Sequence, residues 1–106
     1  MERVGFLLKV RKDRMEEYKR HHEAVWPEML EALTRHGWHN YSLFLSEEGM
    51  LFGYFEAVEN FQASLDGMAT EDANARWQTF MAEYFEDLPG LPDEGMVQLE
   101  QVFYLE

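Results

Sequence analysis

The chain has 106 residues, of which 46% are hydrophobic, and its 21 acidic and nine basic side chains give a formal net charge of -12. This length fits a single domain, residues 1–106, and the acidity opposes binding to nucleic acid or to anionic membranes. No apolar run approaches the roughly 20 residues that cross a bilayer, and the N-terminus lacks the features of a secretory signal. Because cysteine is absent, disulfides and thiolate chemistry are excluded, and a cytoplasmic location is the default expectation.

The N-terminal segment predicts a strand followed by a helix. Hydrophobic residues alternate with others over residues 3–10, which is typical of a half-buried strand. The helix is expected to start near Arg14, with Asp13 as its cap and Glu16 completing a capping box.

This helix carries the chemically richest side chains. Three- and four-residue spacing predicts one inward stripe, made of Met15, Tyr18, His22, Val25 and Met29. Pro27 lacks a backbone donor, so we expect a break at Trp26 and a second helical segment that ends at Gly37. The bend would open a gap beside Tyr18 and His22.

The remaining segments predict a hairpin, a second helical layer and a last strand. Residues 39–46 and 50–58 alternate in hydrophobicity on either side of a short turn. Residues 60–84 are predicted to be helical in two pieces, interrupted at Gly67 and capped again at residues 70–72. Residues 88–95 hold the remaining prolines and predict a loop, and residues 96–105 predict a final strand.

The order strand, helix, strand, strand, helix, strand indicates an α+β fold of the ferredoxin-like, split βαβ plan. In this plan the helices cover one face of an antiparallel sheet. The last predicted strand is apolar on both faces toward its end, at residues 102–105. We therefore expect a homodimer in which sheet packs on sheet.

His22 is the first candidate for acid–base chemistry, because imidazole titrates near neutrality. A histidine on an inward stripe can equally be structural. Tyr18, one turn earlier, could orient a hydroxyl of a small polar ligand. Tyr41 could meet this stripe across the sheet, and alternation places His39 on the same strand face and Asn40 on the opposite one.

Other residues have both a functional and a structural interpretation. Trp77 could stack on a sugar ring and Arg76 could bridge hydroxyls, although a core tryptophan explains the pattern equally well. Trp26 precedes the bend and could simply pack. No metal site is expected from the histidines at 21, 22, 36 and 39, because adjacent helical residues diverge and no metal-binding spacing is present.

Several separated motifs resemble the L-rhamnose mutarotase family over nearly the whole chain. They are Glu17-Tyr18, His22, Val25-Trp26-Pro27-Glu28, His36-Gly37, His39-Asn40-Tyr41, Arg76-Trp77 and Val102-Phe103-Tyr104-Leu105. The resemblance implies a dimeric α+β barrel and a cytoplasmic isomerase of sugar catabolism. It also implies interconversion of the α and β anomers of L-rhamnopyranose, or of a related sugar, without cofactor or metal.

The resemblance also implies roles for individual residues. The family's proton donor falls on His22, and its substrate-binding tyrosines fall on Tyr18 and Tyr41. The family has two consecutive tryptophans in the sugar pocket, and here Trp77 is followed by Gln78, which replaces a stacking surface with an amide. Ring opening needs a proton delivered to the ring oxygen and one removed from the anomeric hydroxyl. The base stays open between water and His39.

Other activities occur on the same fold. Dimeric α+β barrels include cofactor-free monooxygenases and haem-binding proteins, and the fold does not choose among them. Tyr18, Tyr41, Asn40 and Arg76 predict a pocket more polar than those functions need. A non-catalytic sugar-binding module is the third alternative.

Overall fold

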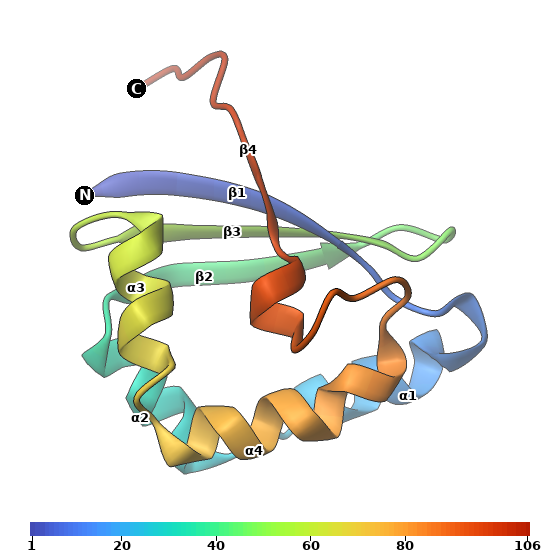
Figure 1. Cartoon of the computed structure of the whole chain (residues 1–106). Coiled ribbons are helices and arrows are strands. Elements are labelled where there is room, and N and C mark those ends of the chain that lie inside the picture. Colours follow the sequence, from blue (N-terminus) through green and yellow to red (C-terminus); the bar gives the residue numbers. More distant parts are fainter.

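The computed structural model describes residues 1–106, which form a four-stranded antiparallel sheet covered by helices on one face (Figure 1). The strands are β1 (Glu2–Lys9), β2 (Trp38–Leu45), β3 (Met50–Ala57) and β4 (Val97–Leu99), in the spatial order β2-β3-β1-β4. All neighbouring strands pair antiparallel. This order is that of the split βαβ plan, so the predicted fold class is confirmed.

The helical layer consists of four α-helices and three 3-10 turns. They are η1 (Lys12–Arg14), α1 (Met15–His22), α2 (Pro27–Arg35), α3 (Phe61–Met68), α4 (Asp72–Met81), η2 (Ala82–Tyr84) and η3 (Pro92–Gly95). The η3 turn lies in the predicted loop between α4 and β4 and brings that loop back over the helical layer.

The predicted break at Trp26 is present. Trp26 has φ -57° and ψ 135°, and Pro27 is the first residue of α2. A residue before proline is pushed out of the helical region, and proline is tolerated at the first helical position because its missing N–H would have no partner there. The second segment ends before Gly37, whose φ of 79° suits glycine.

The capping box predicted at Asp13 is wrong. The chain forms η1 before α1, and no side chain caps the first turn of either. Asp13 lies inside η1, one residue before Arg14, which occupies the N-cap position of α1. Glu16 instead forms an ion pair with Lys19, with 2.9 Å between Oε1 and Nζ.

The helical segment predicted over residues 60–84 is in two pieces, α3 and α4. The break falls at residues 69–71 and not at Gly67. Asn60 caps α3, because its Oδ1 accepts a hydrogen bond from the Ala63 N–H at 2.8 Å. Gly67 lies inside α3, where a Cβ would overlap the imidazole ring of His36. This glycine therefore permits the end of α2 to pack closely on α3.

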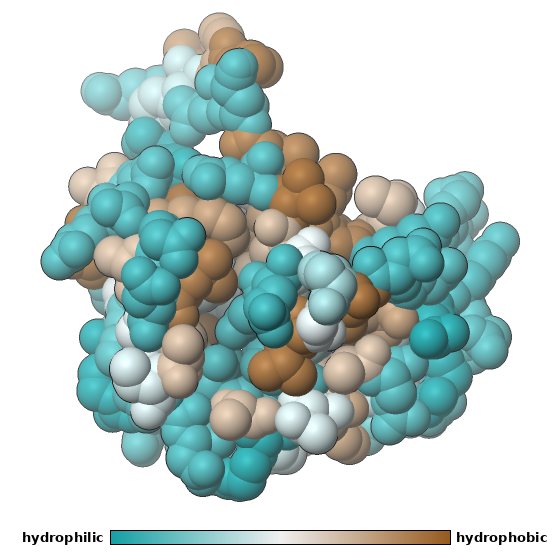
Figure 2. Space-filling model, viewed as in Figure 1, coloured by the Kyte–Doolittle hydropathy of each residue, from teal (hydrophilic) through white to brown (hydrophobic).

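The final strand was predicted too long. Only Val97–Leu99 pair with β1, and residues 100–106 leave the sheet and project from the molecule (Figure 1). Val102, Phe103 and Leu105 are 86%, 78% and 79% exposed, whereas the Tyr104 ring lies against the Arg3 guanidinium, whose Cζ is 3.7 Å from the ring centroid. In Figure 2 this projecting segment shows brown, hydrophobic atoms among teal ones.

Strict alternation in β2 fails at an irregularity between His39 and Ser42. Asn40 has a φ of 50°, and the local register shift changes which side chains share a face. Tyr41 packs with Trp38 in the core, at 5.0 Å between ring centroids. His39 pairs with Glu56 on the outer face of the sheet, where Asn40 also lies, so the predicted shared face of His39 and Tyr41 is wrong.

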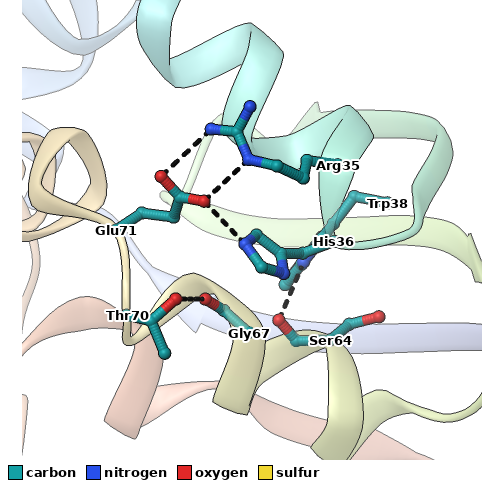
Figure 3. A network of polar contacts seen from close by, with 7 residues as sticks. All are labelled: Arg35, His36, Trp38, Ser64, Gly67, Thr70 and Glu71. Carbon is teal, nitrogen blue, oxygen red and sulfur yellow. Dashed lines mark hydrogen bonds and ion pairs between the residues drawn. The ribbon is translucent and has the colours of Figure 1, made fainter.

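A polar network holds the end of α2 against the turn between α3 and α4 (Figure 3). Arg35 Nε and Nη2 donate to the Glu71 carboxylate at 2.9 and 3.0 Å, and His36 Nε2 lies 2.7 Å from it. These hydrogen bonds, that from Arg35 first, lower the pKa of Glu71 to about 2. Beside them, Trp38 Nε1 donates to the Ser64 carbonyl at 3.2 Å and so fixes the indole at the start of β2.

In the core between sheet and helices, the Phe6 ring of β1 lies directly over Gly53 of β3. A Cβ on residue 53 would overlap this ring. We expect Gly53→Ala to lower the free energy of unfolding by about 1–3 kcal/mol, because the fully buried Phe6 ring must move. Gly5→Ala is the matched control, since its nearest neighbour would be the partly exposed Phe52 ring at 3.3 Å. Equal denaturation midpoints for the two variants would contradict this packing.

Glu71 should make stability depend on pH. Its folded pKa lies below the unfolded value, so its contribution is complete above about pH 4.5 and is lost as the pH falls toward 2. Glu71→Gln should therefore unfold more easily than the native protein at pH 7, and the difference should shrink below pH 4.5. Urea denaturation at pH 7, 4.5 and 3 measures this. Glu47→Gln, an exposed site without an ion pair, should show no such trend, and a pH-independent effect of Glu71→Gln would refute the assignment.

Candidate active site

A cavity of about 310 Å³ lies between the inner face of the sheet, α2 and α4. Most of its lining is apolar, and the polar exceptions are His22, Tyr41, Asn74, Gln78 and Asp93. Small-molecule pockets measure about 300–1,000 Å³ and combine apolar walls with a few directed polar groups. The cavity is therefore of a size for a compact ligand such as a monosaccharide.

His22, the last residue of α1, presents one ring nitrogen to this cavity. Its Nδ1 donates to the Tyr18 carbonyl at 2.9 Å, one turn back along the helix. Its Nε2 has no protein partner, and because no buried polar side-chain atom lacks one, Nε2 faces open space. Burial lowers the pKa of His22, and the Tyr18 carbonyl partly offsets the effect. The ring is thus held in one orientation with Nε2 free to exchange a proton.

Both predicted tyrosines lie beside His22. Tyr41 lines the main cavity, and Tyr18 lines a small adjoining space of about 50 Å³ that His22, Tyr41 and Trp77 share. Neither hydroxyl has a protein hydrogen-bond partner. Burial raises the pKa of both phenols, so both stay protonated and can donate hydrogen bonds to a ligand.

Trp77 of α4 forms an indole wall next to His22, with 5.5 Å between the ring centroids. Trp26 packs edge-on against Trp77 from outside the cavity, at 5.0 Å. Arg76 lies over Trp26 and forms an ion pair with Asp72 at 2.9 Å. Trp26 and Arg76, predicted as further site residues, do not line the cavity.

A series of hydrogen-bonded polar side chains forms another part of the cavity wall. Gln78 Oε1 accepts a hydrogen bond from the Asp93 N–H at 2.9 Å, and Gln78 Nε2 donates to Asn74 Oδ1 at 3.3 Å. Asn74 Nδ2 donates to Asp93 Oδ2 at 3.1 Å. Burial raises the pKa of Asp93, and the Asn74 hydrogen bond opposes the shift. The Gln78 amide thus anchors η3 to α4, in addition to facing the cavity.

Asn74 and Asp93 were not predicted from the sequence. The four-residue spacing of Asn74 and Gln78, which places them on one helix face, was a usable signal. No sequence signal pointed to Asp93, because it reaches the cavity only where its loop folds back onto α4.

His39 and Asn40 do not reach the cavity, contrary to the prediction. Asn40 Nδ2 donates to Glu56 at 3.0 Å on the outer face of the sheet, where His39 also lies. The cavity is consequently more apolar than expected. His21 faces η2, with Nε2 3.0 Å from the Tyr84 hydroxyl, and does not line the cavity either.

The structure contains no group of three or more histidine, aspartate or glutamate side chains arranged to hold a metal ion. None of its helices has the length and apolar character to cross a membrane.

Comparisons with known proteins match the whole chain to one family. A family model described as L-rhamnose mutarotase matches residues 3–105. Proteins named L-rhamnose mutarotase from Mannheimia succiniciproducens and Bacillus subtilis are 42% and 38% identical, and each match covers 100% of both chains. A crystal structure of an L-rhamnose mutarotase from Formosa agariphila superposes with a TM-score of 0.82 at 29% identity, covering 100% of both chains.

Sequence and fold therefore agree on one assignment. The chain belongs to the L-rhamnose mutarotase family.

Proposed function

We propose that this protein is an isomerase that interconverts the α and β anomers of L-rhamnopyranose in the His22 cavity. The observation that carries the proposal is the free Nε2 of His22. The Tyr18 carbonyl accepts a hydrogen bond from Nδ1 of the same ring and so orients Nε2 in a cavity beside the Trp77 indole. The mostly apolar lining would also suit the monooxygenase and haem-binding alternatives. The full-length match to named mutarotases favours the sugar reaction.

The reaction needs only proton transfers. Protonated His22 donates from Nε2 to the ring oxygen while the anomeric hydroxyl loses its proton, so that the C1–O5 bond breaks and a C1 carbonyl forms. Rotation about the C1–C2 bond and reclosure give the other anomer. The lowered pKa of His22 makes its imidazolium a stronger acid. Trp77 would stack on the sugar, and the hydroxyls of Tyr18 and Tyr41 would hold sugar oxygens.

His22→Gln should slow anomer exchange by about 10²- to 10⁴-fold, the usual contribution of general acid–base catalysis. Exchange between the two anomeric signals of L-rhamnose, followed by NMR, measures the rate. His21→Gln is the matched control, because the neighbouring imidazole contacts Tyr84 outside the cavity. Equal rates for folded His22→Gln and native protein would remove His22 from the mechanism. Binding of L-rhamnose without faster exchange would instead indicate a sugar-binding module.

We also infer that the protein is a homodimer joined through the outer face of the sheet. Phe44, Phe52, Val97 and Leu99 are 60%, 38%, 61% and 37% exposed there, and the apolar segment 102–105 projects beside them. Monomers rarely expose connected apolar patches of more than a few hundred Å². Pairing two such faces would cover them and complete a dimeric α+β barrel. A cytoplasmic location stays a prediction from the cysteine-free sequence.

Light scattering after size exclusion should give twice the chain mass of 12.6 kDa. Phe52→Glu should shift the protein toward the monomer, because it places a charge in the buried face. Thr79→Glu adds the same charge on the exposed side of α4 and should leave the mass unchanged. A monomeric native protein would contradict the dimer.

A further inference from the structure

We propose that the carboxylate of Asp93 is the general base that removes the proton from the anomeric hydroxyl. This inference rests on the proposed mutarotase function and assigns the half of the reaction that His22 does not perform. Asp93 and His22 line the same cavity but come from opposite ends of the chain, on η3 and α1.

The surroundings of Asp93 orient its carboxylate. Its N–H is held by Gln78 Oε1 at 2.9 Å, and its Oδ2 is held by Asn74 Nδ2 at 3.1 Å. Its Oδ1 has no protein partner, and no buried polar side-chain atom lacks one, so Oδ1 is open. Two anchors thus leave one carboxylate oxygen free, on a residue that lines both the His22 cavity and a neighbouring pocket between α3, α4 and η3.

Few other ionisable groups face Asp93. Tyr41 of β2 and His22 of α1 line the same cavity, Glu94 is its neighbour on η3, and α4 contributes the neutral amides of Asn74 and Gln78. Burial raises the pKa of Asp93 and lowers that of His22. The carboxylate is therefore a stronger base, and the imidazolium a stronger acid, than either would be in water.

The proton balance closes without a cofactor. Asp93 takes the proton of the anomeric hydroxyl as the C1 carbonyl forms, while His22 gives its Nε2 proton to the ring oxygen as the C1–O5 bond breaks. After rotation about C1–C2, the C5 hydroxyl attacks the carbonyl and returns its proton to His22. The new anomeric oxygen takes its proton from Asp93. Both groups end in their starting forms.

The structure disfavours His39, the alternative base suggested by the sequence. His39 pairs with Glu56 on the outer face of the sheet, on the other side from the cavity. Among the residues that line the cavity, Asp93 carries the one carboxylate.

The test measures the rate of L-rhamnose anomer exchange by NMR from pH 4 to pH 9. The native rate should fall at low pH as Asp93 becomes protonated and at high pH as His22 loses its proton. Asp93→Asn should lose about 10²-fold or more and should no longer show the low-pH decrease. Glu94→Gln is the control, because Glu94 is exposed and the glutamine retains an oxygen to accept from the Leu91 N–H. It should keep the low-pH decrease, moved to a lower pH because the Glu94 charge helps to raise the pKa of Asp93.

A second variant separates chemistry from loop anchoring. Asp93→Ala keeps the backbone N–H that Gln78 holds, and added formate should restore part of its exchange rate by supplying the missing carboxylate. A folded Asp93→Asn with the native rate or an unchanged low-pH limb overturns the proposal, as does the absence of formate rescue in folded Asp93→Ala. If native protein does not accelerate exchange, the mutarotase function itself fails, which is a distinct result.

Discussion

Pro27 has no backbone N–H and forces the residue before it out of the helical region, so α1 cannot continue into α2. The chain turns at residues 23–26, between the end of α1 and the start of α2. His22 therefore ends one helix while the apolar face of α2 forms the adjacent wall. The cavity follows from this break, because a continuous helix would pack its inward stripe against the sheet.

Trp77 then fixes the distance between α1 and α4. It contacts the His22 ring on one side and the Trp26 ring on the other, with centroids 5.5 and 5.0 Å away. The aromatic contacts stabilise the helical layer by apolar burial and also place a flat ring beside the free nitrogen of His22. The same residue thus serves the packing of the helices and the geometry of the cavity, so substitution of Trp77 would affect both.

The features that could be predicted from sequence are those set by local chemistry. Alternation placed β1 and the hairpin, and proline chemistry placed the break at Trp26. Tyr41, Trp77 and Gln78 were expected beside His22, and all of them line the cavity or the space next to it. The family resemblance contributed Gln78, which periodicity alone would not have selected.

The features that could not be predicted depend on distant contacts or on departures from regular geometry. The register shift at Asn40 puts His39 and Tyr41 on opposite faces of the sheet. Asparagine tolerates the positive φ at this position, but the alternation pattern does not require it. Asp93 enters the cavity because its loop folds back onto Gln78, 15 residues earlier. Residues 100–105 were expected to be strand, yet a strand needs a partner strand, and within one chain this segment has none.

The central claim is that one cavity holds both the sugar and the groups that move its protons. A crystal structure of the protein with L-rhamnose tests this most directly. We predict that the sugar lies against Trp77, with its ring oxygen within hydrogen-bond distance of His22 Nε2 and its anomeric hydroxyl near Asp93 Oδ1. A sugar bound outside this cavity, or one whose anomeric carbon faces away from His22, would contradict the account.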